Sequence, residues 1–308
     1  MQSKGAEVLA TTTAVVVTFN IGERFNHYID GYRDNFKRVI IIDNGSSDST
    51  PAILGKLQSE HANISVILLE RNVGLASAQN IAMRKALEDA GTAFIFLMDH
   101  DSCPGTESLG ILADFAAATR DDQTIGLLGM LPVEEGSTDA EPKVTDALSG
   151  PVLRHGVRVT PAVTIMASGT LIRRSIFDRF GFFDDRLFID DIDHDYSMKL
   201  HCAGLHNFVV NDAVLIHNLG ERIEIDFLGK VRRITWHSPF RRYYIIRNAI
   251  WMWRRYFWNL PRYTVMDAYQ ILKDTAKVLI LDKKHRQANA RAVLNGLKDG
   301  IFSRLARH

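Results

Sequence analysis

Two aspartates directly follow a short apolar stretch near the middle of the first half of the chain. The stretch is Ala93–Met98, and Asp99 and Asp101 come after it, two positions apart. A short apolar run between polar residues predicts a strand buried on both faces, and ligands of open α/β sheets bind beyond the carboxyl ends of such strands. Carboxylates that share a cleft repel each other unless a cation joins them, and oxygen ligands favour Mg²⁺ or Mn²⁺ over Zn²⁺. The alternative is that both aspartates only cap the next helix.

A second acidic run has four aspartates within six positions: Asp190, Asp191, Asp193 and Asp195. Such crowding is expected to raise the pKa of at least one carboxyl group, which suits that group to act as a general base. Its neighbours Asp190 or Asp195 could instead position a substrate or cap a helix. His217 follows a predicted strand at 208–216 and is a candidate metal ligand, although a single histidine is more often structural.

Other polar residues stand where further strands are predicted to end. Asp43 ends the second strand as Asp99 ends the fourth, so both are expected at the same edge of the sheet, where Asp43 would accept hydrogen bonds from a base or ribose. Ser168 and Gly169 interrupt a predicted strand at 164–174. Small residues there would let a ligand approach the backbone closely, and an ordinary bulge is the alternative.

The order of strands and helices indicates an α/β fold with a Rossmann-like, mostly parallel central sheet flanked by helices. Neither GxGxxG nor GxxxxGK[ST] occurs, which argues against dinucleotide enzymes and P-loop NTPases. The predicted strands are 14–19, 39–42, 64–69, 93–99, 126–131, 164–174 and 208–216, and the predicted helices are 23–36, 51–60, about 74–90, one after 105, and 193–202.

Charge is distributed unevenly along the 308 residues, although the formal net charge is only +1. Residues 221–308 have 19 Lys and Arg against 7 Asp and Glu, whereas residues 1–220 have 18 against 29. We therefore expect an acidic domain at 1–220 and a basic, mostly helical C-terminal region at 221–308. The two cysteines fit a reducing compartment, and neither a signal peptide nor an apolar run of about 18 residues is seen, so a cytoplasmic protein is expected.

The basic region has an apolar stripe at helical spacing: Tyr243, Ile246, Ile250, Trp253 and Phe257. With the arginines around it, the stripe predicts either an interfacial helix on anionic lipid headgroups or a helix packed on the catalytic body. Peripheral contact with the inner face of the plasma membrane is one interpretation, and solvated helix faces are another. Further stripes at 268–279 and 294–305 would pack together or form a homodimer.

Taken together, these motifs resemble the family 2 glycosyltransferases of GT-A fold, and most closely their bacterial rhamnosyltransferase branch. The matching pieces follow in family order over residues 14–220: Thr18-Phe-Asn20, Asp43-Asn-Gly-Ser-Ser-Asp48, Asn72-Val-Gly74 with Ala78-Gln-Asn80, Asp99-His-Asp101, Ser168-Gly169-Thr170, Asp190-Asp191-Ile-Asp193 and His217-Asn-Leu-Gly220. Tyr244-Ile-Ile-Arg247-Asn248 is similar as well. One departure is Lys199, at a position where the family usually has arginine.

The resemblance implies an inverting sugar transfer from a nucleotide diphosphate to an acceptor hydroxyl. Asp193 would be the catalytic base, and Asp99, Asp101 and His217 would bind Mg²⁺ or Mn²⁺. The implied donor-binding residues are Thr18, Asn20, Asp43, Asn72, Gly74, Asp99 and Arg247, and the implied acceptor or sugar pocket comprises Ser168, Gly169, Asp190 and Asp191. Arg247 would contact either the diphosphate or the acceptor.

The implied donor is dTDP-β-L-rhamnose, and the implied acceptor is a glycan or a polyprenyl-diphosphate-linked saccharide of cell-surface polysaccharide synthesis. Another nucleotide sugar such as a UDP-sugar, and a non-catalytic nucleotide-sugar binding module, are the alternatives. A nucleotidyltransferase would need a Gly-rich, basic phosphate loop after the first strand, which is absent. The acidic body argues against a nucleic-acid partner.

Overall fold

The computed structural model describes residues 4–105, 107–134, 144, 146–217, 222–227 and 230–303. The chain forms two compact units, one of Met1–Arg186 with Asp193–Asn218 and one of Leu187–Ile192 with Leu219–His308. The sequence-based boundary at 220/221 falls outside the described residues. The short segment Leu187–Ile192 therefore belongs to the unit formed by the C-terminal residues.

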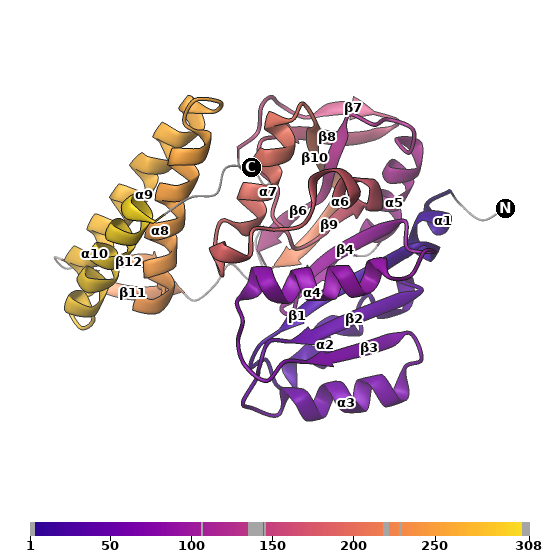
Figure 1. Cartoon of the computed structure of the whole chain (residues 1–308), viewed down its shortest axis with the longest axis horizontal. Helices are drawn as coiled ribbons and strands as arrows, with labels where there is room; N and C mark the ends of the chain where they lie inside the picture. Colours follow the sequence, from indigo (N-terminus) through magenta and orange to yellow (C-terminus); the bar gives the residue numbers. More distant parts are fainter. Residues whose placement is uncertain are drawn as a thin grey trace. The chain divides into compact units, whose positions relative to one another are not determined.

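A large mixed sheet forms the centre of the first unit, with strand order β3-β2-β1-β4-β9-β6-β10-β8-β7 (Figure 1). Four neighbouring strands are parallel, and they are the short apolar runs that the sequence predicts as buried strands. Their bounds are β1 (Thr12–Thr18), β2 (Arg38–Asp43), β3 (Ile64–Leu68) and β4 (Phe94–Asp99).

The other side of the sheet is mixed. β6 (Ile125–Glu134) and β10 (His206–His217) run parallel to each other, while β9 (Thr170–Arg173) is antiparallel to both β4 and β6. The strand predicted at 164–174 begins only at Thr170. The short strands β5 (Ser102–Pro104), β7 (Val152–Arg154) and β8 (Val157–Ala162) were not predicted from the sequence. The sheet is therefore parallel from β3 to β4 and mixed beyond β4, where the β6–β10 pair is parallel and the other pairs are antiparallel.

Helices flank this sheet, as predicted, and most lie where periodicity placed them. Tyr196 and Leu200 of the helix at 192–202 are buried and lie one helical turn apart, on the face that packs into the core. The predicted helix at 23–36 is divided in the structure into a helix at 24–29 and a single 3₁₀ turn at 33–35. The helices are α1 (Lys4–Ala10), α2 (Arg24–Ile29), α3 (Thr50–Glu60), α4 (Leu75–Leu87), α5 (Ser108–Ala118), α6 (Arg174–Phe180) and α7 (Ile192–Cys202).

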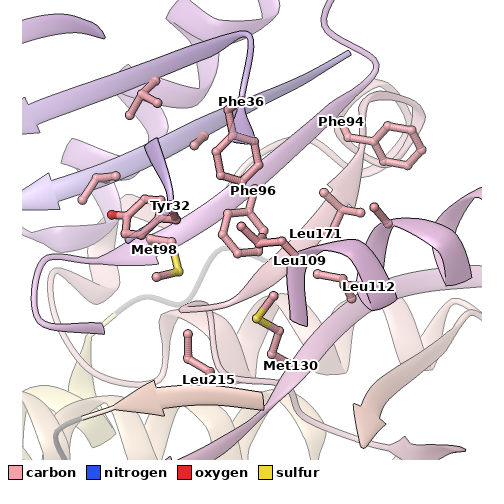
Figure 2. Close-up of a cluster of buried hydrophobic side chains, with 14 of the residues drawn as sticks. Tyr32, Phe36, Phe94, Phe96, Met98, Leu109, Leu112, Met130, Leu171 and Leu215 are labelled. Atoms are coloured by element: carbon pink, nitrogen blue, oxygen red, sulfur yellow. The ribbon is translucent and has the colours of Figure 1, made fainter. Parts of the chain in front are cut away.

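Aromatic and aliphatic side chains fill the core on one side of the sheet (Figure 2). Phe36 and Phe96 stack with their ring centroids 5.2 Å apart, and Tyr32 is fully buried next to Phe36. Phe96 and Met98 come from β4, the strand that leads to Asp99. Close packing along β4 therefore fixes the end of the strand, where the acidic pair begins.

The second unit is not entirely helical, since a hairpin of β11 (Arg222–Phe227) and β12 (Lys230–Thr235) precedes its helices. Three helices follow, α8 (Pro239–Tyr256), α9 (Pro261–Leu281) and α10 (Arg286–Phe302), and they pack against one another (Figure 1). Ser238 caps α8 by accepting a hydrogen bond from the backbone N–H of Arg241. None of the helices in the described ranges is long and apolar enough to cross a membrane.

Close contact between α8 and α10 accounts for much of the predicted α8 stripe. Ile246 and Ile250 are buried, and Gly296 and Gly300 of α10 lie directly over them. A Cβ at Gly296 would lie 2.9 Å from the Cβ of Ile246. Tyr243 of the stripe donates a 2.7 Å hydrogen bond to Asp299. This part of the stripe therefore packs on α10 inside the second unit, and neither the catalytic body nor a membrane surface is needed to cover it.

Candidate active site

Three potential metal ligands meet at the carboxyl ends of two strands. Asp99 ends β4, Asp101 follows two residues later, and His217 ends β10; one ligand atom from each lies within 4.8 Å of the others. The short strand β5 explains the meeting, because it pairs antiparallel with β10 and places Ser102 opposite His217. The structure thus brings together the three residues that the sequence predicted as metal ligands.

The imidazole of His217 is held by its neighbours. The Nδ1 atom is hydrogen-bonded to the hydroxyl of Ser102 at 2.6 Å. A hydrogen bond at one ring nitrogen is typical of histidines that bind a metal through the other. Burial lowers the pKa of His217, while the Asp101 carboxylate acts in the opposite direction. The lowered pKa favours the neutral imidazole, which is the form that coordinates metals.

His100, between the two aspartates, connects β4 to the first strand. Its Nδ1 accepts a hydrogen bond of 3.3 Å from the backbone N–H of Phe19, directly after β1. Burial is the main cause that lowers the pKa of His100, Arg24 lowers it further, and Asp101 opposes them. In an uncharged imidazole one ring nitrogen carries a lone pair, so it can accept this backbone hydrogen bond.

One turn anchors both acidic segments. The hydroxyl of Ser168 accepts a 3.0 Å hydrogen bond from the backbone N–H of Asp99, and the backbone N–H of Ala167 donates a 3.0 Å hydrogen bond to the carboxylate of Asp193. Asp99 and Asp193 are far apart in the sequence, yet each is hydrogen-bonded to one of two consecutive residues, Ser168 and Ala167. The second carboxylate oxygen of Asp193 accepts from the backbone N–H of His194 at 3.0 Å, at the start of α7, where the helix dipole favours an anion.

Gly169, in the same turn, has a left-handed backbone with φ +76°. A Cβ there would lie 3.1 Å from Leu215 Cδ2 and 3.2 Å from Met130 Cβ. Its carbonyl accepts from the backbone N–H of Met130 at 3.0 Å. The positive φ and these close neighbours favour glycine at this position, while a role of Gly169 in a sugar pocket stays a prediction.

The carboxylate of Asp43 lies 1% exposed at the end of β2 and organises the loop after it. It accepts hydrogen bonds from the Thr18 hydroxyl at 3.0 Å, the Ser46 hydroxyl at 2.5 Å and the Ser46 backbone N–H at 2.8 Å. Thr18 is itself fully buried. Asp43 thus links the ends of β1 and β2, and its role toward a base or ribose stays a prediction.

Loops after the first three strands interlock beside Asp43. The Oδ1 atom of Asn20 accepts a 2.9 Å hydrogen bond from the backbone N–H of Ser47. Asn72 accepts from the Asn44 amide at 3.2 Å and from the backbone N–H of Gly74 at 2.9 Å, directly before α4. The backbone N–H of Asn20 also donates to the Ser46 hydroxyl at 2.8 Å, which connects these loops to Asp43, and the resulting polar network lies at the edge of the sheet where a nucleotide is expected.

The remaining predicted residues belong to the second unit. Asp190 and Asp191 have left-handed backbones with φ +65° and +60°, and Arg241 forms a two-point ion pair with Asp190, 2.7 Å at its shortest. Arg247 donates to the carbonyl of Leu187 at 3.0 Å and lies over the rings of Tyr244 and Trp251. Within this unit, therefore, Asp190 and Arg247 both help to fix the 187–191 loop.

Sequence reasoning overlooked the residues that support these groups. Ser102, Ala167, Asn44 and Ser46 each hold a candidate functional residue in place. Asn44 and Ser46 stand in a polar run directly after a predicted strand, a pattern that could have identified them. The roles of Ser102 and Ala167 depend on pairing across the fold. Asn218 and Gly220 of the His217 motif lie outside the described residues.

This mixed sheet, with acidic residues at the ends of its strands, is the fold of GT-A glycosyltransferases. Among solved structures, GalNAc-T7 with UDP, GalNAc and Mn²⁺ superposes with a TM-score of 0.61 at 14% identity, over 96% of this chain and 56% of that chain. The mannosyltransferase PcManGT from Pyrobaculum calidifontis, in complex with GDP-Man and Mn²⁺, gives 0.55 at 13% identity, over 96% and 88%. This chain spans just over half the length of the GalNAc-T7 chain.

Sequence comparison gives the family directly. The Glycosyl transferase family 2 profile matches residues 13–181, and the chain belongs to this family. It is also similar to the dTDP-rhamnosyl transferase RfbF of Shigella flexneri, with 28% identity over 249 residues, which is 79% of this chain and 79% of that protein. The predicted fold class and the resemblance to family 2 are therefore confirmed.

Proposed function

We propose that this glycosyltransferase transfers L-rhamnose from dTDP-β-L-rhamnose, with inversion, to a hydroxyl of a saccharide or polyprenyl-diphosphate-linked acceptor in cell-surface polysaccharide synthesis. The observation that carries the proposal is the cluster of Asp99, Asp101 and His217 at the strand ends, with Asp193 anchored to the turn that also holds Asp99. The choice of rhamnose is supported by similarity to RfbF. A UDP-sugar is the alternative donor.

The cluster fits Mg²⁺ or Mn²⁺. The cluster offers hard carboxylate oxygens and one imidazole nitrogen, and each of the three side chains is partly buried. Such sites usually complete the coordination of Mg²⁺ or Mn²⁺ with water molecules and phosphate oxygens. A divalent ion bound there supplies Lewis-acid stabilisation of the leaving diphosphate. Asp99, Asp101 and His217 would hold the ion, and the hydrogen bond from Ser102 fixes the orientation of the His217 ring.

The protein's own residues carry the rest of the reaction. The acceptor oxygen forms a bond to the anomeric carbon, the bond from that carbon to the diphosphate oxygen breaks with its electron pair, and Asp193 takes the hydroxyl proton. A carboxylate in this role contributes about 10²–10⁴-fold. The hydrogen bonds from the backbone N–H groups of Ala167 and His194 keep the Asp193 carboxylate in one orientation. We place the nucleotide at the network of Thr18, Asn20, Asp43, Asn72 and Gly74.

Incubation of the protein with a panel of nucleotide sugars, with and without Mn²⁺, tests this function. We expect release of dTDP from dTDP-β-L-rhamnose that needs the divalent ion, and transfer once a suitable saccharide acceptor is added. Release of UDP from a UDP-sugar, without release of dTDP from dTDP-β-L-rhamnose, would show that the donor is a UDP-sugar. If no nucleotide sugar is hydrolysed or transferred while one still binds, the chain is a non-catalytic nucleotide-sugar binding module.

We further propose that the reaction takes place in the cytoplasm, where both cysteines would stay reduced. The chain has two cysteines, Cys103 and Cys202, too few for a disulfide framework, which fits a reducing compartment.

A further inference from the structure

Large apolar side chains lie exposed along one side of α9. Val265, Tyr269, Leu272 and Ile280 are between 52% and 68% exposed. Steps of four, three and eight residues place them, with Ala276, on the same face of the helix. The opposite face carries the buried residues Thr264 and Val278, so α9 uses that other face to pack in its own unit.

α10 shows the same division. Leu294, Leu297 and Ile301 are 65%, 39% and 51% exposed and lie one helical turn apart. Ala292, Gly296 and Gly300 are on the buried side that packs against α8. Two neighbouring helices therefore each present an apolar row that the packing of the second unit does not require, which marks an interaction surface.

Charges are also segregated on these helices. Among residues 261–303, each exposed charged residue is basic: Arg262, Lys273, Lys283, Lys284, Arg286, Arg291 and Lys298. The acidic residues of the same range are buried or half-buried. Each accepts a hydrogen bond from a residue of the same unit: Asp267 from Trp253, Asp274 from Gln270, Asp282 from His285 and Asp299 from Tyr243. The exposed side of α9 and α10 is thus apolar and cationic together.

This combination distinguishes between the partners that such a surface could bind. A second copy of the chain would set one cationic row against another, and like charges in contact are unfavourable. A lipid bilayer with anionic headgroups accepts both features, because apolar side chains enter the acyl boundary while Lys and Arg meet the phosphates. Charge complementarity therefore favours the bilayer.

We propose that the exposed faces of α9 and α10 dock the protein on an anionic membrane surface. This assignment differs from the α8 stripe considered from the sequence, because Ile246 and Ile250 of that stripe are buried. The proposal is independent of the sugar donor and of the acceptor, since it concerns only the second unit and needs no catalysis.

Co-sedimentation of the full chain with vesicles tests the proposal. We expect binding to phosphatidylcholine vesicles that contain phosphatidylglycerol and little binding to phosphatidylcholine alone. Each cation near an anionic surface contributes roughly fivefold to the partition coefficient, so Lys273→Glu/Lys298→Glu is expected to weaken binding by at least about 25-fold. The matched control is Lys56→Glu/Lys85→Glu, which makes the same charge change on α3 and α4 of the first unit and should leave binding close to wild type.

The apolar part has its own variant, Tyr269→Ser/Leu272→Ser. Both side chains are exposed, so the fold is expected to keep its melting temperature while vesicle binding falls even at low salt. Equal binding to neutral and anionic vesicles, or equal loss in the Lys56→Glu/Lys85→Glu control, would overturn the proposal. So would a dimer in sedimentation velocity that Leu272→Glu dissociates, because the surface would then belong to a second copy.

Discussion

The position of Asp193 illustrates how backbone groups prepare a side chain for chemistry. Both of its carboxylate oxygens accept backbone N–H groups, one from Ala167 and one from His194. Backbone donors are fixed by the fold, so the carboxylate is oriented before any substrate arrives. Because Ala167 is followed by Ser168, which holds Asp99, the orientation of the proposed base is coupled to the metal cluster through a single turn.

Asp193→Asn is expected to abolish transfer while donor binding persists. The amide oxygen retains one backbone hydrogen bond, but the amide group cannot accept the acceptor's proton, so the transfer rate should fall by about 10²–10⁴-fold. The transfer rate and, by calorimetry, the donor Kd are measured together. Asp178→Asn, an exposed aspartate of α6, serves as the control with wild-type activity. Turnover near the wild-type rate in Asp193→Asn would remove Asp193 as the base.

At the scale of elements, glycines decide how closely α8 and α10 approach. Gly296 faces the Tyr243 carbonyl and Ile246, and Gly300 faces Ile250 and the Arg247 carbonyl, with hypothetical Cβ contacts of 2.8 Å to 3.1 Å among them. Two backbone carbonyls are among these neighbours, and backbone cannot rotate away as a flexible side chain can. The spacing of four residues between the glycines places them on the same face of α10.

Gly296→Ala is therefore expected to lower stability by about 1–3 kcal/mol through overpacking. Thermal unfolding followed by circular dichroism measures the change. Gly55→Ala is the matched control, because Gly55 also lies inside a helix but has nothing within 4 Å of its Cβ position. It should raise stability by about 0.4–1 kcal/mol, since alanine restricts the unfolded chain. Equal shifts in both variants would contradict the close contact.

Another element depends on one asparagine. The loop at 187–191 has three non-glycine residues with positive φ, namely Phe188, Asp190 and Asp191, a conformation that costs roughly 1–3 kcal/mol each. The fully buried Asn248 amide donates to the carbonyls of Leu187, Ile189 and Asp190 at 2.8 Å to 3.0 Å, and its oxygen accepts from Arg247. The hydrogen bonds offset the strain and hold the loop that leads, two residues on, to Asp193.

Asn248→Ala should release this loop. Removal of the Asn248 amide leaves buried carbonyl groups without their donor, which costs about 1–3 kcal/mol of stability. We therefore expect faster amide hydrogen exchange in peptides covering 187–191 and a lower transfer rate. The exposed Asn259, in the turn between α8 and α9, provides the control variant Asn259→Ala. Unchanged exchange in the 187–191 peptides would show that the loop keeps its conformation without Asn248.

At the scale of the whole molecule, sequence and structure agree where periodicity is strong. The four parallel strands are predominantly apolar runs, and β1, β2 and β4 end at Thr18, Asp43 and Asp99, polar residues at one edge of the sheet. β5 could not be predicted, because Ser102–Pro104 has no strand pattern and pairs only because β10 lies beside it. The hairpin β11–β12 was missed although Ile223, Ile225 and Phe227 alternate with charged residues, a period of two that indicates a strand.

The candidate site shows the same limit. Asp99 and Asp101 were predicted as an acidic pair after one strand and His217 as a candidate metal ligand after another, and the resemblance to family 2 joined them in one metal site. No local pattern, however, reveals the pairing of Ser102 with His217 that brings the three together. The link between Asp193 and Asp99 through Ala167 and Ser168 is likewise a tertiary feature. Local patterns in the sequence place side chains on elements, whereas the neighbours of those side chains follow from contacts between residues more than 25 positions apart.

All three proposed metal ligands belong to the first unit, which predicts where a bound ion stabilises the molecule. A ligand at about 100 times its Kd stabilises the state that binds it by about 2.7 kcal/mol. With Mn²⁺, amide hydrogen exchange should slow in peptides from β4, β5 and β10, which carry the ligands, and peptides from α9 serve as the internal reference. Asp101→Asn should abolish this protection while Asp178→Asn retains it. If Mn²⁺ slows exchange equally in Asp101→Asn, the ion binds elsewhere and the cluster at the strand ends is not its site.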